Sequence, residues 1–310
     1  MSASVIHTSL IHKAFRLSRE DSENASSDAM APRETVKMLV LETDEPHPET
    51  MKHRGRFGEI LDRFFSDAGA RHDPPLSIET DMRFIVDDPD NDHHGKVLKA
   101  TDISEDTTAI LITGSMYDAH GDDPWIAATR NLIEELWRTR PNMKFSGICF
   151  GHQILARTLG AKVEATPGEK WELSHTSMDL SAVGKKLFLT EDDTISVHQM
   201  HQDQVSSLPS SETTDLLEEG QKVHIWASTK HTKIQGLYIR DRLFTSQGHL
   251  GFDETMVRRQ IELRQKSGAI KEKNAEEVQY AEETAHLEHD GEIVAAAILR
   301  FFHGDDHNID

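Results

Sequence analysis

Residues 145–153 read Phe-Ser-Gly-Ile-Cys-Phe-Gly-His-Gln and contain the chain's single cysteine, Cys149. A strand-like run leads into the cysteine, glycines stand two positions before and after it, and a helix-like run follows. The neighbours are small because a side chain beside a sharply turned residue would clash. The pattern predicts a nucleophile elbow at a strand–helix junction, where the helix N-terminus favours a thiolate. A buried cysteine at a strand end is the simpler alternative.

The composition argues against several classes of partner. The chain has 34 basic and 54 acidic residues, so its net charge is −20. With no basic stripe, we expect no nucleic-acid partner and no anionic membrane. One cysteine excludes an intrachain disulfide and fits a reducing compartment, and no apolar run approaches the ~18–20 residues that span a bilayer. We therefore expect a cytoplasmic protein.

Residues 1–34 are interpreted as a disordered leader. The part from 1 to 19 lacks acidic residues and carries three basic ones, which weakly resembles a mitochondrial presequence. Polar filler is the simpler interpretation, and Met30 offers a natural second start, so the sequence leaves open whether 1–29 belong to the mature protein. We expect the main domain at 35–268 and a helical extension at 269–310.

The main domain alternates strands and helices. Strands are expected at 36–41, 82–86, 108–113 and 144–149, with 36–41 at the centre, and helices at 54–70, 122–138 and 151–159. Shorter strands follow at 172–180, 194–200, 222–228, 234–239 and 243–246, then helices at 253–265 and 275–302. The alternation predicts an α/β fold with a doubly wound, mostly parallel sheet flanked by helices and an antiparallel extension. Reactive residues should lie at the carboxyl ends of strands.

A cysteine nucleophile needs a base and hydrogen-bond donors for an oxyanion. His249 is the best candidate for the base, because it follows a glycine at another strand end. The N–H of Phe150, directly after the cysteine, and an N–H in the loop at Gly114 are candidate oxyanion donors. Taken alone, that glycine loop is equally consistent with a simple turn.

Two histidine-containing segments are possible metal sites. His198 and His201 lie three residues apart, and His93 and His94 follow an acidic loop at 87–92. The second segment lacks ligand spacing, and the first is better interpreted as a loop near the active site. We expect no metal and no cofactor.

Taken together, these segments resemble the class I glutamine amidotransferase family. The resemblance runs from about residue 36 to about residue 265. The matching pieces are the loop at 114–115, the elbow at 149–153, the segment 200–203 and the strand end at 247–249. Stand-alone fungal amidotransferase-like proteins and plant cytosolic gamma-glutamyl peptidases also share the pattern Gly-Ser-x-x-Asp-Ala-x-x-x-Asp-x-Trp-Ile, here 114–126, and the stretch 171–173.

The resemblance implies attack of a thiolate on the gamma-carbonyl of glutamine or of a gamma-glutamyl peptide, a gamma-glutamyl thioester, and hydrolysis by water. Cys149 would be the nucleophile and His249 the base and acid, with Gly114 and Phe150 stabilising the oxyanion. The residues to which it gives substrate-binding roles are Ser115, Gln153, His201 and Asp203.

The sequence departs from the family after the base. The family reads His-Pro-Glu, in which Glu orients the His, whereas this chain has Gly251 at the third position. Loss of the orienting carboxylate can cost roughly 10⁴ in rate, although a Cys–His pair depends on it less. Asp253 or Glu254 could substitute, but both are placed to cap the next helix.

Three functions stay open from the sequence. The first is a stand-alone hydrolase or transferase that releases ammonia or passes it to a separate ammonia-accepting enzyme, because no synthetase domain or phosphate-binding loop is expected. The second, favoured by Gly251, is a repurposed member acting as a binding or regulatory subunit or as a tailoring protein in a biosynthetic pathway. The third is a redox or glyoxalase-type protein with a similar cysteine elbow. The helical region 275–302 offers an amphipathic surface for packing in cis or within a homodimer.

Overall fold

The computed structural model describes residues 33–306 and 309, and Glu34–Asp310 form one compact unit. The leader expected at 1–34 therefore lies, apart from its last two residues, outside the described residues. In the described part of the chain, no helix is both long and apolar enough to cross a membrane.

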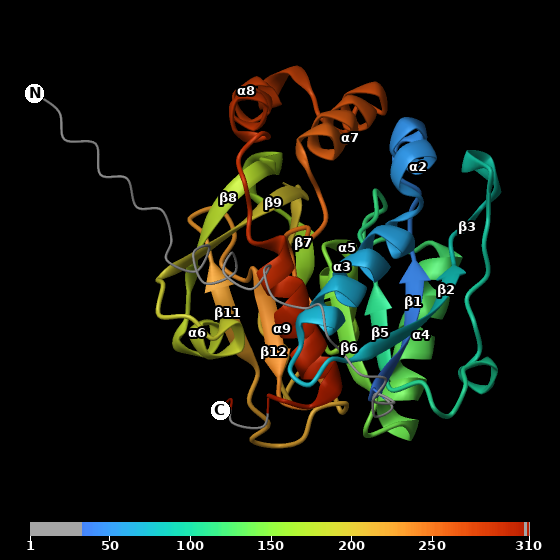
Figure 1. Ribbon diagram of the computed structural model, residues 1–310. Coiled ribbons are helices and arrows are strands. Elements are labelled where there is room, and N and C mark those ends of the chain that lie inside the picture. Colours follow the sequence, from blue (N-terminus) through green and yellow to red (C-terminus); the bar gives the residue numbers. More distant parts are fainter. Residues whose placement is uncertain (1–32, 307–308, 310) are drawn as a thin grey trace, which may run out of the picture. The chain divides into compact units, whose positions relative to one another are not determined.

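One nine-stranded mixed sheet forms the centre of the unit (Figure 1). Along the sheet the strands are β2 (Ser77–Phe84), β1 (Thr35–Glu42), β5 (Ala109–Ile112), β6 (Lys144–Ile148), β13 (Leu243–Ser246), β12 (Gly236–Ile239), β11 (His224–Ser228), β8 (Glu172–Leu180) and β9 (Thr194–His201). Pairing is parallel from β2 to β13 and antiparallel from β13 to β9. The α/β fold and its antiparallel extension are confirmed.

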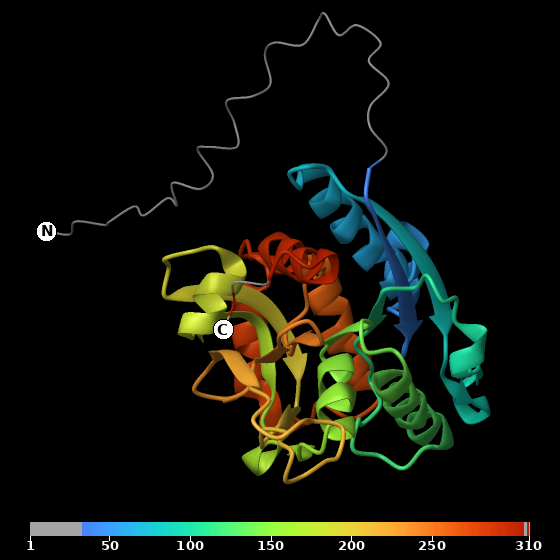
Figure 2. The ribbon, with the colours of Figure 1, turned by 90° about the horizontal axis from the view of Figure 1, so that it is seen from below.

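Helices cover both faces of this sheet (Figure 2). On one face lie α3 (Phe57–Arg71), α6 (Ala182–Phe188) and α9 (Gly291–His303), and on the other lie α4 (Pro124–Thr139) and α5 (Phe150–Thr158). Beyond the carboxyl ends of the parallel strands lie α7 (Glu254–Lys266) and α8 (Ala275–Thr284), packed near β9 and β8 (Figure 1).

The remaining elements are short. They are α2 (Pro48–Arg54), the pairs β3 (Asp87–Asp88) with β4 (His93–His94) and β7 (Val163–Ala165) with β10 (Asp203–Val205), and the 3-10 turns η1 (Pro89–Asn91), η2 (Ala100–Asp102), η3 (Pro167–Glu169) and η4 (Glu272–Asn274).

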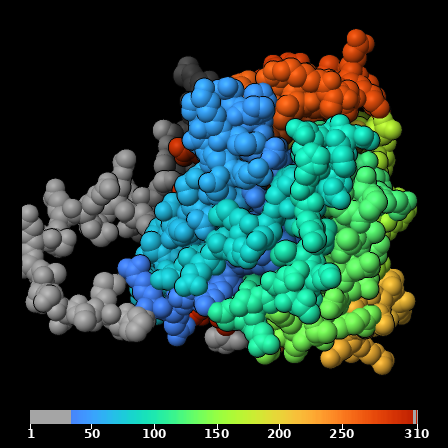
Figure 3. Space-filling model, turned by 90° about the vertical axis from the view of Figure 1, so that its right-hand side faces the viewer, coloured from blue at the N-terminus to red at the C-terminus, as the bar shows by residue number. Residues whose placement is uncertain are grey.

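Two expectations about strands were wrong. β1 is the neighbour of the edge strand β2 and not the central strand, because the antiparallel strands extend the sheet on the side away from β1. β2 begins at Ser77, five residues before the predicted start. Its side chains are half-buried or exposed, so it lacks an apolar run; β2 and the segment after it, cyan to teal, form much of the surface in Figure 3.

Helix α9 is built into the main core. Val294, Ile298 and Phe301 are buried in the cluster that also contains residues of β1 and β13. Their spacing places them on one face of the helix. The ring of Phe302 lies 6.0 Å from that of Phe65 on α3. The helical region after residue 268 thus packs in cis through α9.

We predict that Phe301→Ala lowers the free energy of unfolding by about 3–5 kcal/mol, because it removes a fully buried ring and leaves a cavity. Urea unfolding of the full chain measures the effect. Leu287→Ala is the control, since Leu287 is 39% exposed and its loss should cost less than about 1 kcal/mol. Equal losses in the two variants would contradict the placement of α9 in the core.

Candidate active site

Cys149 stands in a sharp turn between β6 and α5. Its φ is 54° and its ψ is −105°, and its N–H donates to the carbonyl oxygen of Ser246 at 2.8 Å. A Cβ built on Gly147 would lie 2.3 Å from the carbonyl of Gly151, and one built on Gly151 would lie 2.2 Å from the carbonyl oxygen of Ile112. The turn therefore requires glycine at both flanking positions, which is the geometry that the sequence predicts.

His249 follows β13. Its imidazole and the side chain of Cys149 both lie close to Gly114. The backbone N–H of His249 donates to the carbonyl oxygen of His198 at 2.8 Å. A Cβ built on Gly114 would lie 2.8 Å from Cε1 of His249 and 3.4 Å from Cβ of Cys149. A side chain at position 114 would thus displace the imidazole. In the described residues, the hydrogen bond of Sγ is to the carbonyl oxygen of Met200 at 3.9 Å and not to His249; such contacts are often long without substrate.

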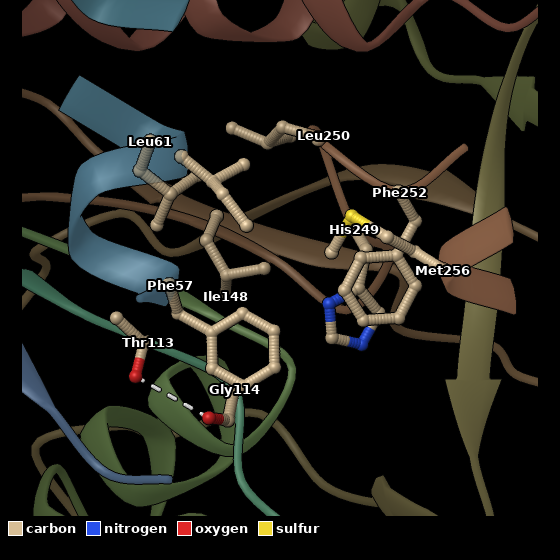
Figure 4. Close-up of a pocket in the computed structure, with 11 residues that line it drawn as sticks. Phe57, Leu61, Thr113, Gly114, Ile148, His249, Leu250, Phe252 and Met256 are labelled. Carbon is tan, nitrogen blue, oxygen red and sulfur yellow. Dashed lines mark hydrogen bonds between the residues drawn. The ribbon is translucent and has the colours of Figure 1, made fainter. Parts of the chain in front are cut away.

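Apolar groups surround the far side of the His249 ring (Figure 4). The ring of Phe252 stacks on the imidazole with centroids 3.9 Å apart. A small cavity of about 20 Å³ lies beside it, lined by apolar side chains that include Ile148. A Cβ built on Gly251 would lie 2.9 Å from Cγ2 of Ile60. At Gly251, the position where the family pattern has its orienting acid, the structure thus has apolar packing.

Asp253 and Glu254 do not replace that acid. Oδ1 of Asp253 accepts the N–H of Met256 at 2.8 Å and caps α7, while Oδ2 pairs with Arg54 at 2.5 Å. Glu254 pairs with Arg258 at 3.0 Å. Both carboxylates are engaged on the surface and neither contacts His249, which corrects the expectation that one of them could orient the ring.

The four predicted substrate-binding residues all line one pocket with Cys149. The pocket has a cavity volume of about 90 Å³. Nε2 of Gln153 donates to the carbonyl oxygen of Asp203 at 2.9 Å. Oγ of Ser115 donates to the carbonyl oxygen of Thr43 at 2.6 Å. These two side chains hold the loops that form the pocket walls.

His201 is fixed by acceptors at both ring nitrogens. Nδ1 lies 2.9 Å from the carbonyl oxygen of Asp203, and Nε2 lies 3.0 Å from Oε2 of Glu172. Burial raises the pKa of Glu172, but hydrogen bonds from His201 and Thr229 more than offset this and leave it below its ordinary value. His201 is thus a structural link between β9 and β8, and its nitrogens are not free to hold a metal.

The pocket rim carries a group of residues that could hold a cation. Ligand-type atoms of Asp118, His120 and Asp203 lie within 4.8 Å of one another. Burial and the neighbouring Asp118 raise the pKa of Asp203. This end of the pocket is therefore acidic, which suits a cationic part of a ligand.

Arg264 is a pocket residue that the sequence interpretation did not identify. It is 7% exposed and lines the pocket of Cys149 as well as a smaller neighbouring cavity with His249 and Asp44. In the described residues its guanidinium forms no hydrogen bond and no salt bridge. Its position in the amphipathic helix α7 gave no sequence signal, because arginine there usually faces solvent.

Burial shifts the pKa values of Cys149 and His249 toward their neutral forms. Burial raises the pKa of the Cys149 thiol to about 12, although the charge of Arg264 and the N–H of Phe150 act in the opposite direction. Burial, with His201 and Arg264 nearby, lowers the pKa of His249 to about 3. The helix N-terminus that should favour a thiolate is outweighed by burial.

These features define an α/β protein with a cysteine elbow beside a histidine. The family described as "Glutamine amidotransferase class-I" matches residues 86–295, which is more than half of the chain. The chain belongs to the class I glutamine amidotransferase family.

Relatives are found in fungi and plants. A glutamine amidotransferase-like protein of Schizosaccharomyces pombe is 26% identical over 85% of this chain and 97% of its own length. A Saccharomyces cerevisiae protein that is named after the glutamine amidotransferases is 30% identical over 62% of this chain and 70% of its own length. Gamma-glutamyl peptidase 5 of Arabidopsis thaliana is 38% identical over 33% of this chain and 41% of its own length.

A solved structure agrees on the fold. A glutamine amidotransferase of Thermotoga maritima has a TM-score of 0.55 and 19% identity, and the match covers 86% of this chain and 98% of that one. At this identity the similarity shows the fold alone.

We predict that iodoacetamide alkylates Cys149 about tenfold faster for each pH unit between 7 and 10, because a raised pKa keeps the thiol protonated throughout this range. An ordinary thiol levels off above about pH 9. Intact mass reports this one site, since the chain has one cysteine. Protein unfolded in urea is the control. A rate that is already at its plateau at pH 7 in the folded protein would contradict the neutral thiol.

Proposed function

We propose that this protein is a stand-alone hydrolase or transferase that cleaves a gamma-glutamyl amide, either glutamine or a gamma-glutamyl peptide, through a thioester on Cys149. The observation that carries the proposal is the elbow at Cys149 with His249 beside it across Gly114. The gamma-glutamyl peptidases among the relatives support this substrate class.

In the proposed reaction, the Sγ proton passes to His249 as sulfur attacks the gamma-carbonyl carbon. The N–H groups of Phe150 and Gly114 donate to the resulting oxyanion. His249 then gives its proton to the leaving nitrogen, and the gamma-glutamyl thioester remains on Cys149. Water attacks the thioester with His249 as base and releases glutamate, or an amine acceptor takes the gamma-glutamyl group instead.

The proposed reaction starts from a neutral pair without an orienting acid. Phe252 holds the imidazole of His249 by stacking, which fixes the plane of the ring. Stacking supplies no negative charge to balance the imidazolium that forms during attack. We therefore expect a slower reaction than a complete triad gives, by a factor that can approach about 10⁴.

We further propose that Arg264 binds the alpha-carboxylate of the glutamyl group. It is a buried cation that forms no salt bridge in the described residues, although its charge acts on the buried carboxylate of Asp44, and it lines the same pocket as Cys149. Asp118 and Asp203, in the same pocket, would face the alpha-ammonium group. One positive and two acidic residues would match the two charges of an amino acid.

The fate of the released ammonia, the cellular compartment and the oligomeric state are inferred from the sequence alone. Released ammonia would leave as product or pass to a separate enzyme, and the single cysteine suits a reducing compartment such as the cytoplasm. A homodimer stays a prediction.

A repurposed binding or regulatory protein is the second candidate. Gly251 and the apolar surroundings of His249 favour it, because they remove the group that would stabilise a protonated imidazole. In that case the pocket at Cys149 would bind its ligand without turnover.

We predict that wild-type protein incubated with glutamine, glutathione or an electrophilic glutamine analogue gains the mass of a gamma-glutamyl thioester or adduct, and that the first two release glutamate. Intact-protein mass spectrometry and a glutamate assay make the measurement. Cys149→Ser removes the sulfur and is the control. If wild type shows neither labelling nor glutamate, the hydrolase proposal fails and the binding role becomes the better one.

We predict that Arg264→Met raises KM for the turned-over substrate by about 10- to 100-fold with a smaller change in kcat, because a charge-assisted hydrogen bond to the substrate is lost. Arg258→Met is the matched control on the same helix, since Arg258 is exposed and pairs with Glu254. If Arg264→Met and Arg258→Met have the same KM, Arg264 does not bind the substrate.

A further inference from the structure

A second cluster of titratable groups lies at the opposite end of the sheet, beside the start of β1. His72 follows α3, His303 ends α9, and Asp305 lies in the next turn. Nε2 of His72 and Nδ1 of His303 both lie 2.8 Å from the same oxygen, Oδ2 of Asp305. The two rings have centroids 5.3 Å apart. Three ligand-type atoms thus meet within 4.8 Å.

The outer ring nitrogens of both histidines face acceptors. Nδ1 of His72 lies 2.7 Å from the carbonyl oxygen of Pro74, which can only accept, so Nδ1 carries a proton. Nε2 of His303 lies 2.7 Å from Oε2 of Glu34, a carboxylate that also accepts. The inner nitrogen of His72 therefore carries a lone pair that points at Asp305 when the ring is neutral. His303 instead meets a carboxylate at each ring nitrogen; burial lowers its pKa, but the hydrogen bonds with Glu34 and Asp305 outweigh this effect and raise it.

The lone pair of His72 and Oδ2 of Asp305 repel each other unless a positive charge lies between them. The neighbouring guanidinium of Arg71 does not supply it, because Arg71 pairs with Glu292 at 2.6 Å. Either protons on the inner nitrogens or a bound metal ion can supply this positive charge. Metal binding distinguishes the two possibilities, because only the second one requires it.

We propose that His72, His303 and Asp305 bind a divalent transition-metal ion of the zinc class. Two imidazole nitrogens and one carboxylate oxygen form a donor set that Zn²⁺ accepts, with water in the fourth position. The contacts of the outer nitrogens with Pro74 and Glu34 are those that orient metal-binding histidines.

The geometry needs little adjustment to admit the ion. Ligand atoms about 2.0–2.1 Å from a tetrahedral ion lie about 3.3 Å from one another, so the Asp305 carboxylate would retreat by about half an ångström. Asp305 lies in a turn and is more exposed than either histidine, so this movement disturbs no core residue. The ion would join the end of α3 to the end of α9.

The test uses the full chain after treatment with a chelator and dialysis. Calorimetric titration with ZnCl₂ at pH 7.5 should show one site with a dissociation constant below about 1 μM. Thermal unfolding should shift upward by about 5 °C when free Zn²⁺ is 100 times that constant. His72→Gln and His303→Gln should each weaken binding at least 100-fold. His53→Gln is the control and should leave it unchanged, because His53 is exposed on α2 and belongs to neither group of possible metal ligands.

Two results would overturn the proposal. One is the absence of binding tighter than about 10 μM in wild type, which would leave protons as the charge that holds the cluster. The other is retention of tight binding in both the His72 and His303 variants. If those variants fail to fold, Co²⁺ bound to wild type decides: tetrahedral visible absorption bands support the site, and a weak octahedral spectrum contradicts it.

Discussion

A cysteine with a φ of 54° stores about 1–3 kcal/mol of backbone strain, and the strands on both sides of β6 hold it in place. The N–H of Cys149 bonds to Ser246 of β13, and the N–H of Gly151 bonds to Thr113, directly after β5, at 3.1 Å. The two neighbouring strands lead on to His249 and to Gly114. The same hydrogen bonds that stabilise the turn thus bring the thiol of Cys149, the imidazole of His249 and the loop at Gly114 to one point.

Much of the architecture could be predicted because each buried strand carries its own signal. The runs that became β1 and β5 are mostly apolar, since helices cover both of their faces, and β6 could be placed because it leads into the glycine-flanked cysteine. β2 was misplaced because an edge strand with half-exposed side chains has no such run. The order of the strands is set by tertiary pairing, so the sequence did not show that the last of the parallel strands, β13, lies at the centre of the sheet.

The residues of the candidate site likewise differ in whether the local sequence marks them. Cys149 and His249 could be predicted because their glycine neighbours are needed locally, next to them in the chain. Arg264 could not, because its burial depends on how α7 packs over the pocket. Whether Asp253 orients a histidine or caps a helix is likewise a question of geometry at the scale of a few ångströms. Burial also reversed the expected ionisation of the thiol, which no local pattern reports.

The hydrogen bond between Cys149 and Ser246 also has a consequence for biosynthesis. Its two partners are far apart in the chain, and α9, which packs on the same core, is made later still. A ribosome-bound chain that ends before β13 has the cysteine but not the strand that holds its turn. The geometry of this turn therefore forms only after β13 has been synthesised, and a chain truncated before Leu243 would lack the strand that holds it.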